Sequence, residues 1–164
     1  MKKIITLLAV VMMFSLQGCS APTNNVDNNT ISTVFETKPV SFLPASYAIK
    51  YTFPSMLNSS DMVLVYRLTG ISNGNDLWEF LPETHYFADG TRNFSYNFDF
   101  TRNDVQIYLE GNNLSTLDSA YSLNQIFRIV VVPGSFAVSL NTKNYVGVMA
   151  ALKLNENQVQ KINF

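Results

Sequence analysis

The chain has 164 residues, and its 11 basic and 12 acidic side chains give a net charge of −1 at pH 7. This balance lacks the basic footprint of a nucleic-acid-binding protein, and no block of like charges favours another charged partner. A single cysteine and a single histidine exclude an intramolecular disulfide, a Cys-x-x-Cys redox pair and a metal site made of several cysteines or imidazoles.

The first 18 residues have the layout of a secretory signal peptide. Lys2 and Lys3 precede an apolar core, and small and polar residues then lead to Cys19; this order is typical of a cleaved export signal. The uncharged stretch 4–18 is shorter than the roughly 20 residues that a helix needs to cross a bilayer. We therefore predict that residues 1–18 are removed, which leaves nine basic and twelve acidic residues and a charge of about −3.

The four residues Leu16-Gln17-Gly18-Cys19 resemble the lipobox of bacterial lipoproteins. The resemblance implies that Cys19 carries a diacylglyceryl group, that the chain is cut before it and that the new amino terminus is acylated. One acyl chain gives marginal membrane binding and two or more hold stably. Ser20, in place of an aspartate retention signal, implies the outer membrane, with its periplasmic and surface faces both open. The alternatives are an ordinary cleaved signal or an amphiphilic first helix over residues 1–18, and a buried or reactive thiol at Cys19.

Residues 19–30 are the expected lipidated cysteine and a flexible tether. The stretch "SAPTNNVDNNT" offers almost nothing to bury and does not offset the entropy of ordering. Such a linker holds the folded domain within about 20 Å of the lipid surface. A single domain over residues 31–164 is predicted, since this part is rich enough in Val, Ile, Phe and Tyr for one core.

Short β-strands separated by turns are predicted along the domain. Alternating or consecutive apolar residues between Gly, Pro, Asn and Asp indicate them. The expected strands cover residues 31–37, 47–53, 61–68 and 77–81, a meander over 85–110, then 126–133 and 158–164, with a loop at 70–76. Asp89-Gly90 predicts a hairpin with a type I′ turn inside the meander.

Two features refine this pattern. The runs "MVLVY" and "RIVVV" are apolar at consecutive positions, which predicts strands covered on both faces. Near the C-terminus, Tyr145, Val148, Met149 and Leu152 follow helical spacing and predict one short amphipathic helix. Together the elements indicate a mainly all-β fold: an antiparallel β-sandwich, Ig-like or jelly-roll-like, with a short C-terminal helix.

Four segments of the domain look like parts of a family of small, uncharacterised Gram-negative envelope lipoproteins. They are "VLVYRL" (63–68), "DLWEFLPET" (76–84), "DVQIYLEGN" (104–112) and "FRIVVVPGSFA" (127–137). They cover about a third of the mature domain in the family's order. The resemblance implies an envelope location and assigns no catalytic residue.

The candidate ligand-binding residues are Trp78, Glu83, His85 and Tyr86. His85 is the sole histidine and lies beside Glu83, so an envelope hydrolase with a serine nucleophile, or one with two converging carboxylates, is one alternative. Aromatic rings on an exposed sheet or loop rim, those of Trp78, Tyr86, Tyr96 and Tyr108, suggest a carbohydrate-binding module as another. The competing interpretation is that a solitary histidine and alternating aromatic residues belong to the structure of the strands.

The sequence as a whole favours a lipid-anchored, non-enzymatic envelope module. No catalytic motif is recognised, and no cofactor or metal is expected. The predicted partners are membrane lipid through Cys19 and an envelope protein or polysaccharide, with no nucleic acid. The triplet Asp118-Ser119-Ala120 also resembles an O-glycosylation signal of exported proteins.

Overall fold

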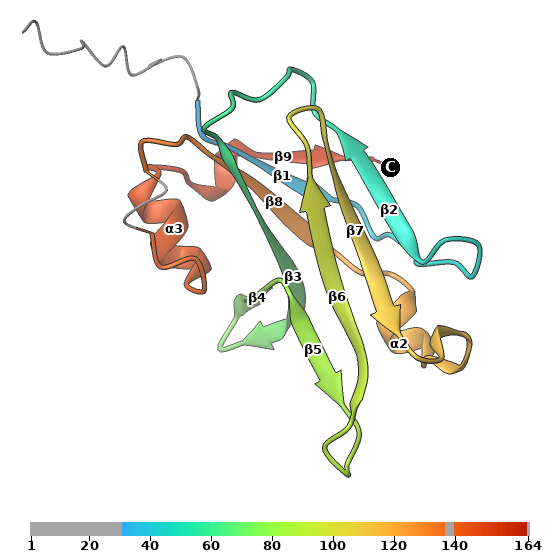
Figure 1. Ribbon diagram of the computed structural model, residues 1–164. Helices are drawn as coiled ribbons and strands as arrows, with labels where there is room; N and C mark the ends of the chain where they lie inside the picture. The colour runs from blue at the N-terminus through green and yellow to red at the C-terminus, as the bar shows by residue number, and fades with distance from the viewer. Residues whose placement is uncertain (1–30, 137–139, 164) are drawn as a thin grey trace, which may run out of the picture.

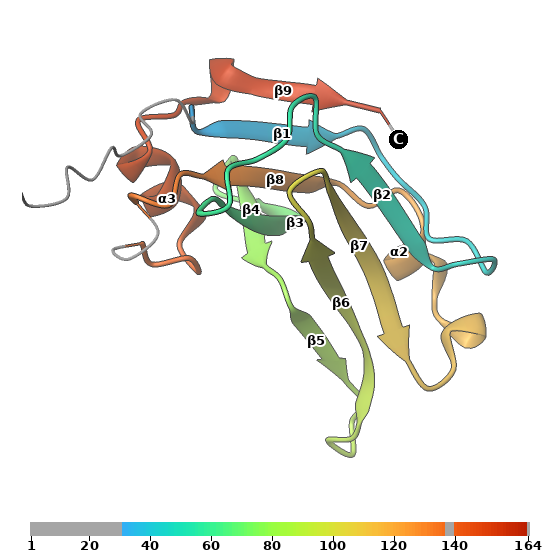
Figure 2. The ribbon, with the colours of Figure 1, turned by 45° about the horizontal axis from the view of Figure 1, so that its top comes forward.

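The computed structural model describes residues 31–136 and 140–163 as two β-sheets packed face to face, with a helix on the outside (Figure 1). Figure 2 shows the two sheets as separate layers. The predicted β-sandwich with a short C-terminal helix is thereby confirmed. The predicted signal peptide, the lipidation at Cys19 and the tether lie outside the described residues.

The larger sheet has five strands in the order β4-β3-β8-β1-β9. Its first and last strands in the chain, β1 and β9, are parallel neighbours, and its other pairs are antiparallel. The strands are β4 (Asn75–Phe80), β3 (Met62–Ser72), β8 (Phe127–Val132), β1 (Thr33–Thr37) and β9 (Val159–Ile162).

The smaller sheet has four antiparallel strands in the order β2-β7-β6-β5. They are β2 (Ala48–Thr52), β7 (Asp104–Gly111), β6 (Arg92–Phe100) and β5 (Glu83–Tyr86). The chain passes from β4 in one sheet to β5 in the other through the cis peptide bond Leu81–Pro82. The two strand orders define the sandwich topology that the sequence left open.

The main core fills the space between the sheets. Val63 and Val65 of β3 point into it together with Phe127 and Ile129 of β8, because alternate strand residues face opposite sides. Their neighbours in β3, such as Leu64, belong to a second cluster on the outer face. Both strands are therefore covered on both faces, as their consecutive apolar residues predicted.

The helix α3 (Tyr145–Ala151) covers that outer face (Figure 1). Tyr145, Val148 and Met149 are buried against β1, β3 and β8, so the apolar stripe of the sequence is the packed face. The helix begins after Asn144, whose side chain accepts a hydrogen bond from the backbone N–H of Gly147, as N-cap residues do. No described helix has the length and apolar character that a membrane crossing requires.

The predicted loop over residues 70–76 is wrong. β3 continues to Ser72 and β4 begins at Asn75, so a tight turn replaces the loop. Asn73 and Gly74 both have positive φ, 51° and 78°, which is the pattern of a type I′ hairpin turn. The Asn-Gly pair carried this signal in the sequence.

The hairpin at Asp89-Gly90 is confirmed, but its predicted turn type is wrong. Only Gly90 has positive φ, whereas a type I′ turn needs two such residues. The Phe87 N–H donates to the Thr91 carbonyl, and the Asp89 carboxylate accepts hydrogen bonds from the N–H and hydroxyl of Thr91. The Asp89 side chain thereby supports a loop that is longer than the expected two-residue turn.

Three short helical turns complete the described chain. They are η1 (Leu114–Thr116), α2 (Ser119–Ser122) and η2 (Glu156–Gln158). The Asp118 carboxylate caps α2 by accepting from the Ala120 N–H at 2.8 Å. Ser119 is exposed at the start of this turn, so the triplet 118–120 lies on the surface.

Candidate functional site

The four candidate residues lie on two different sheets. Glu83, His85 and Tyr86 belong to β5, the edge strand of the smaller sheet, whereas Trp78 belongs to β4, the edge strand of the larger one. Glu83 and His85 adjoin each other, but Trp78 packs against Tyr145 of α3 on the outer face. The residues therefore do not converge on one cleft.

Glu83 is held by an arginine that joins the two sheets. Arg67 of β3 donates to both Glu83 carboxylate oxygens, from Nε at 2.7 Å and from Nη2 at 2.6 Å, and to Gln125 Oε1 from Nη1 at 3.0 Å. Its guanidinium also lies 4.6 Å from the ring centroid of Tyr96. Burial lowers the pKa of Arg67, but the hydrogen bond to Glu83 and the electrostatic interactions with Tyr96, Glu83 and Tyr121 together raise it above the ordinary value. The Glu83 carboxylate is thus a structural partner of Arg67.

His85 is held mainly by aromatic rings. Its imidazole stacks on Phe94 with centroids 4.4 Å apart and planes 8° from parallel, and Tyr121 lies 5.1 Å away. Its Nε2 is 2.8 Å from Glu83 Oε1, but the ring N–H does not point at that oxygen, so the two atoms form no hydrogen bond. Among residues 31–136 and 140–163, no serine hydroxyl is hydrogen-bonded to His85. A Ser/His/acid triad is therefore not assembled in the described part of the chain.

Trp78 has one ring face covered by a cation. The guanidinium of Arg128 lies 4.2 Å from the indole centroid and 5.0 Å from the ring of Tyr145. A cation over an aromatic face is attracted by the ring quadrupole, and the stacking position that a sugar would need is occupied on this side. Tyr86 is 64% exposed. Trp78 lies on the other sheet, so the two rings do not form one surface on which a sugar could stack.

Arg128 is the centre of a second ionic cluster, on the helix side of the larger sheet. It donates from Nη1 and Nη2 to both carboxylate oxygens of Glu156, at 2.8 and 2.6 Å, and from Nε to Glu36 at 2.9 Å. Lys161 of β9 also contacts Glu36. Burial favours the neutral form of Glu36, but the hydrogen bonds from Lys161 and Arg128 prevail and lower its pKa. The cluster ties β1, β8 and β9 together.

Sequence reasoning missed Arg67 and Arg128. The available signal was an arginine inside each otherwise apolar run, "VLVYRL" and "FRIVVV". A charge in a strand that is covered on both faces needs a buried partner. That partner could be neither named nor placed from the sequence, because Glu83 lies 16 residues from Arg67 and Glu36 lies 92 residues from Arg128.

Stability is expected to fall at alkaline pH because of Tyr145. Burial raises its pKa to about 12 from the ordinary value of 10.0. Between these two values the unfolded chain binds fewer protons than the folded one, so the free energy of unfolding decreases as pH rises. Urea unfolding followed by circular dichroism from pH 9 to pH 12 should show this fall, with a shallower one for Tyr145→Phe. Equal slopes for the two proteins would contradict it.

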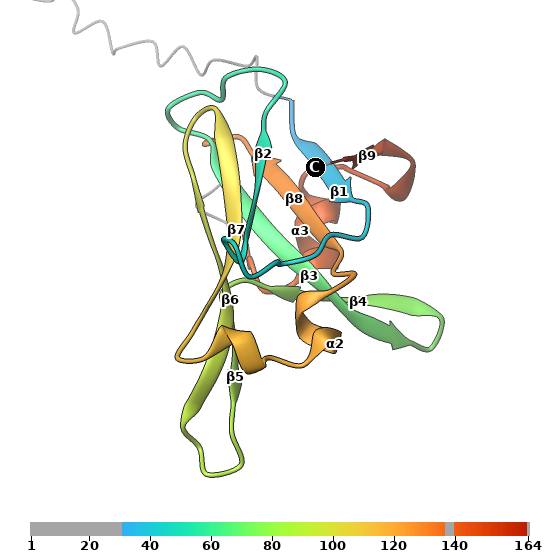
Figure 3. The same ribbon diagram turned by 90° about the vertical axis from the view of Figure 1, so that its right-hand side faces the viewer.

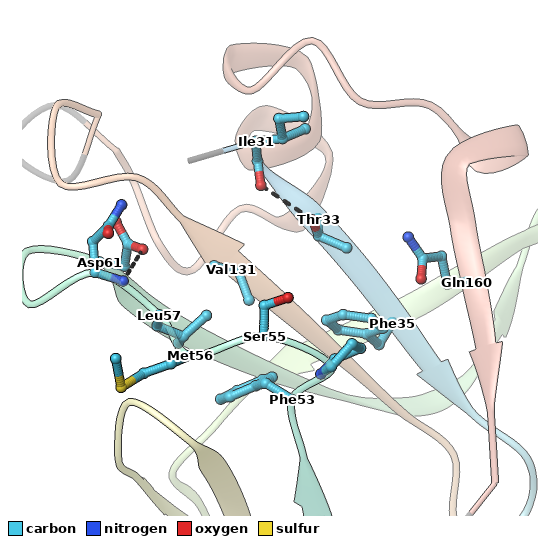
Figure 4. Close-up of a pocket in the computed structure, with 12 residues that line it drawn as sticks. Ile31, Thr33, Phe35, Phe53, Ser55, Met56, Leu57, Asp61, Val131 and Gln160 are labelled. Atoms are coloured by element: carbon cyan, nitrogen blue, oxygen red, sulfur yellow. Dashed lines mark hydrogen bonds between the residues drawn. The ribbon is translucent and has the colours of Figure 1, made fainter. Parts of the chain in front are cut away.

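The described residues also contain a pocket that the sequence did not reveal. It has a volume of about 490 Å³ and lies where the 53–61 segment meets the start of β1 (Figure 4). Phe35 and Val131 of the larger sheet and Phe53 beyond β2 form its inner wall. The remaining lining residues are Ile31, Thr33, Pro54, Ser55, Met56, Leu57, Asn58, Asp61 and Gln160. None of the four sequence candidates lines it.

Comparisons add no relative to this geometry: the chain matches no protein-family model, no curated protein and no solved structure. Within residues 31–136 and 140–163, no three His, Cys, Asp or Glu side chains are grouped so that they could hold a metal ion.

Proposed function

We propose that the protein is a lipid-anchored component of the cell envelope whose β-sandwich acts as a non-enzymatic binding or structural module. Its anchor is the acylated Cys19 of the lipobox-like sequence, and the outer membrane is its location. The segments at 63–68, 76–84, 104–112 and 127–137 support membership of an envelope lipoprotein family. Its partner is an envelope protein or polysaccharide.

The proposal of a non-enzymatic module is supported mainly by the contacts that Glu83 and His85 make within the protein. Glu83 accepts hydrogen bonds from Nε and Nη2 of Arg67, and His85 is stacked on Phe94. General acid–base chemistry needs a group that is within hydrogen-bond reach of its substrate. The pairing of these two side chains instead supports a role in joining β5 to the rest of the sandwich.

A hydrolase assay tests this part directly. The purified protein is incubated with a chromogenic acetate ester and with envelope polysaccharide, and His85→Phe serves as the matched variant because it keeps an aromatic ring on Phe94. We expect no turnover by either protein. Turnover by the wild type that is lost in His85→Phe would establish the hydrolase alternative.

The anchor is tested by metabolic labelling in a Gram-negative host with an alkyne-bearing fatty acid. We expect the wild-type chain to take up the label and Cys19→Ala to lose it, because position 19 is the only cysteine. Ser20→Ala is the control and should be labelled like the wild type. Label that persists in Cys19→Ala would contradict the anchor.

A further inference from the structure

We propose that the pocket at the start of β1 is a lipid slot: it takes one acyl chain of a phospholipid from the bilayer that holds Cys19. The inference rests on the proposed anchor and extends it, because it assigns a ligand class and a membrane-facing end to the sandwich. The slot is lined mainly by residues of β1 and of the segment 53–61 (Figure 4).

The inner wall of the slot is apolar. Phe35 and Phe53 lie with their ring centroids 6.3 Å apart, and Val131 completes this side. All three side chains are buried and belong to the core between the sheets. A pocket of about 490 Å³ has the size of known small-molecule sites, and this wall suits a hydrocarbon chain.

The rim carries large apolar side chains that are open to solvent. Ile31 is 82% exposed and Met56 is 61% exposed, and both line the slot. Asp61 is the only ionisable lining residue; it is buried, and its Oδ2 accepts a hydrogen bond from the Asn58 N–H at 2.8 Å. The rim is therefore apolar at Ile31 and Met56 and, among the described lining residues, carries no exposed charged side chain, which disfavours an ionic ligand.

The polar lining residues favour an amphiphilic ligand over a pure hydrocarbon. Thr33, Ser55, Asn58 and Gln160 lie beside the apolar wall, and they offer hydrogen bonds to an ester or a head group at the mouth. A carbohydrate is disfavoured because the aromatic rings here are buried and present no open face on which a sugar ring could stack.

The position of the anchor selects the bilayer as the source of the ligand. Ile31 lines the slot, and Cys19 precedes it by only 12 residues. The tether predicted from the sequence at that length would have an end-to-end distance of about 20 Å and would keep the slot close to the lipid surface. The intervening residues 20–30 are mostly polar and fit the apolar wall poorly.

The test uses the acylated mature chain in vesicles of phosphatidylethanolamine and phosphatidylglycerol whose acyl chains are brominated at mid-chain. Trp78→Phe removes the only native tryptophan, and Met56→Trp places a reporter at the rim. Tyr86→Trp is the control, because β5 leads into the hairpin at the end of the molecule away from the start of β1 (Figures 1 and 3). We expect bromine to quench the fluorescence at position 56 and not at position 86.

A second substitution distinguishes an acyl chain in the slot from simple contact of position 56 with the membrane surface. Thr33→Phe should fill the slot and abolish most of the quenching at position 56, whereas Thr69→Phe, at an exposed position of β3, should leave it unchanged. Flotation of the same vesicles reports the anchor separately. Protein that fails to float overturns the anchor and the slot together.

Protein that floats but is unquenched at position 56, or whose quenching survives Thr33→Phe, overturns the slot alone. Tryptophan fluorescence at position 56 that is blue-shifted but not quenched also overturns the slot, and it shows that protein rather than lipid occupies the pocket. A blue shift that grows with the protein-to-lipid ratio indicates a second copy of the chain. A shift that is independent of this ratio indicates residues 20–30.

Discussion

Arg67→Met is expected to lower the free energy of unfolding by about 3 to 5 kcal/mol, the usual cost of breaking a buried ion pair by removing one partner. The side chains of Arg67 and Glu83 are only 10% and 13% exposed, so the Glu83 carboxylate would remain without its main partner and poorly hydrated. Urea unfolding of the mature protein followed by circular dichroism measures the change.

Two further variants locate the cause of that loss. Arg92→Met breaks an ion pair whose side chains are 44% and 61% exposed, and it should cost at most about 1 kcal/mol. In the double variant Arg67→Met/Glu83→Leu the stranded charge is gone, so part of the lost stability should return. A double variant less stable than Arg67→Met would contradict this explanation.

Arg128→Met is expected to cause a loss of similar size, about 3 to 5 kcal/mol. The Arg128 side chain is 4% exposed and bonds Glu36, Glu156 and the hydroxyl of Tyr145, whose oxygen lies 2.5 Å from Nη1. Its removal also takes the cation from the face of Trp78. The same urea unfolding experiment, followed by circular dichroism, measures the loss.

The geometry of the guanidinium is tested by Arg128→Lys, which keeps the charge. Because lysine lacks the planar fork that bonds two carboxylates, we expect a loss smaller than that of Arg128→Met but still measurable. Lys50→Met removes a side chain that is 56% exposed from its ion pair with Asp104; this control should change stability much less. A loss for Arg128→Met no greater than that of this control would contradict a structural role for the cluster.

The layout of the sandwich was predictable where local patterns decide it. Consecutive apolar residues marked β3 and β8 as doubly covered, and the spacing of Tyr145, Val148 and Met149 marked the buried face of α3. Both signals arise from periodicity within one element. They do not depend on which distant segment provides the cover.

The pairing of distant segments could not be predicted. The parallel contact of β1 with β9 joins Val34 to Val159, and nothing local encodes a partner more than a hundred residues away. The loop expected at 70–76 was wrong for a different reason, because the turn signal of Asn73-Gly74 was not recognised.

Of the candidate site, only the proximity of Glu83 and His85 could be predicted from the sequence. Glu83 and His85 do lie together, as their neighbourhood in the strand suggested. Trp78, named as a candidate aromatic platform, packs on the outer side of the larger sheet, beside Arg128. The pocket at the start of β1 could not be predicted from the sequence, because its walls come from β1, β8, β9 and the segment 53–61.

Mass spectrometry of the intact mature protein purified from the envelope tests the proposed anchor at Cys19. We expect a chain that begins at Cys19 and carries the added mass of a diacylglyceryl group and an amino-terminal acyl chain. A chain that begins at any other residue, or an unmodified thiol at Cys19, would contradict it.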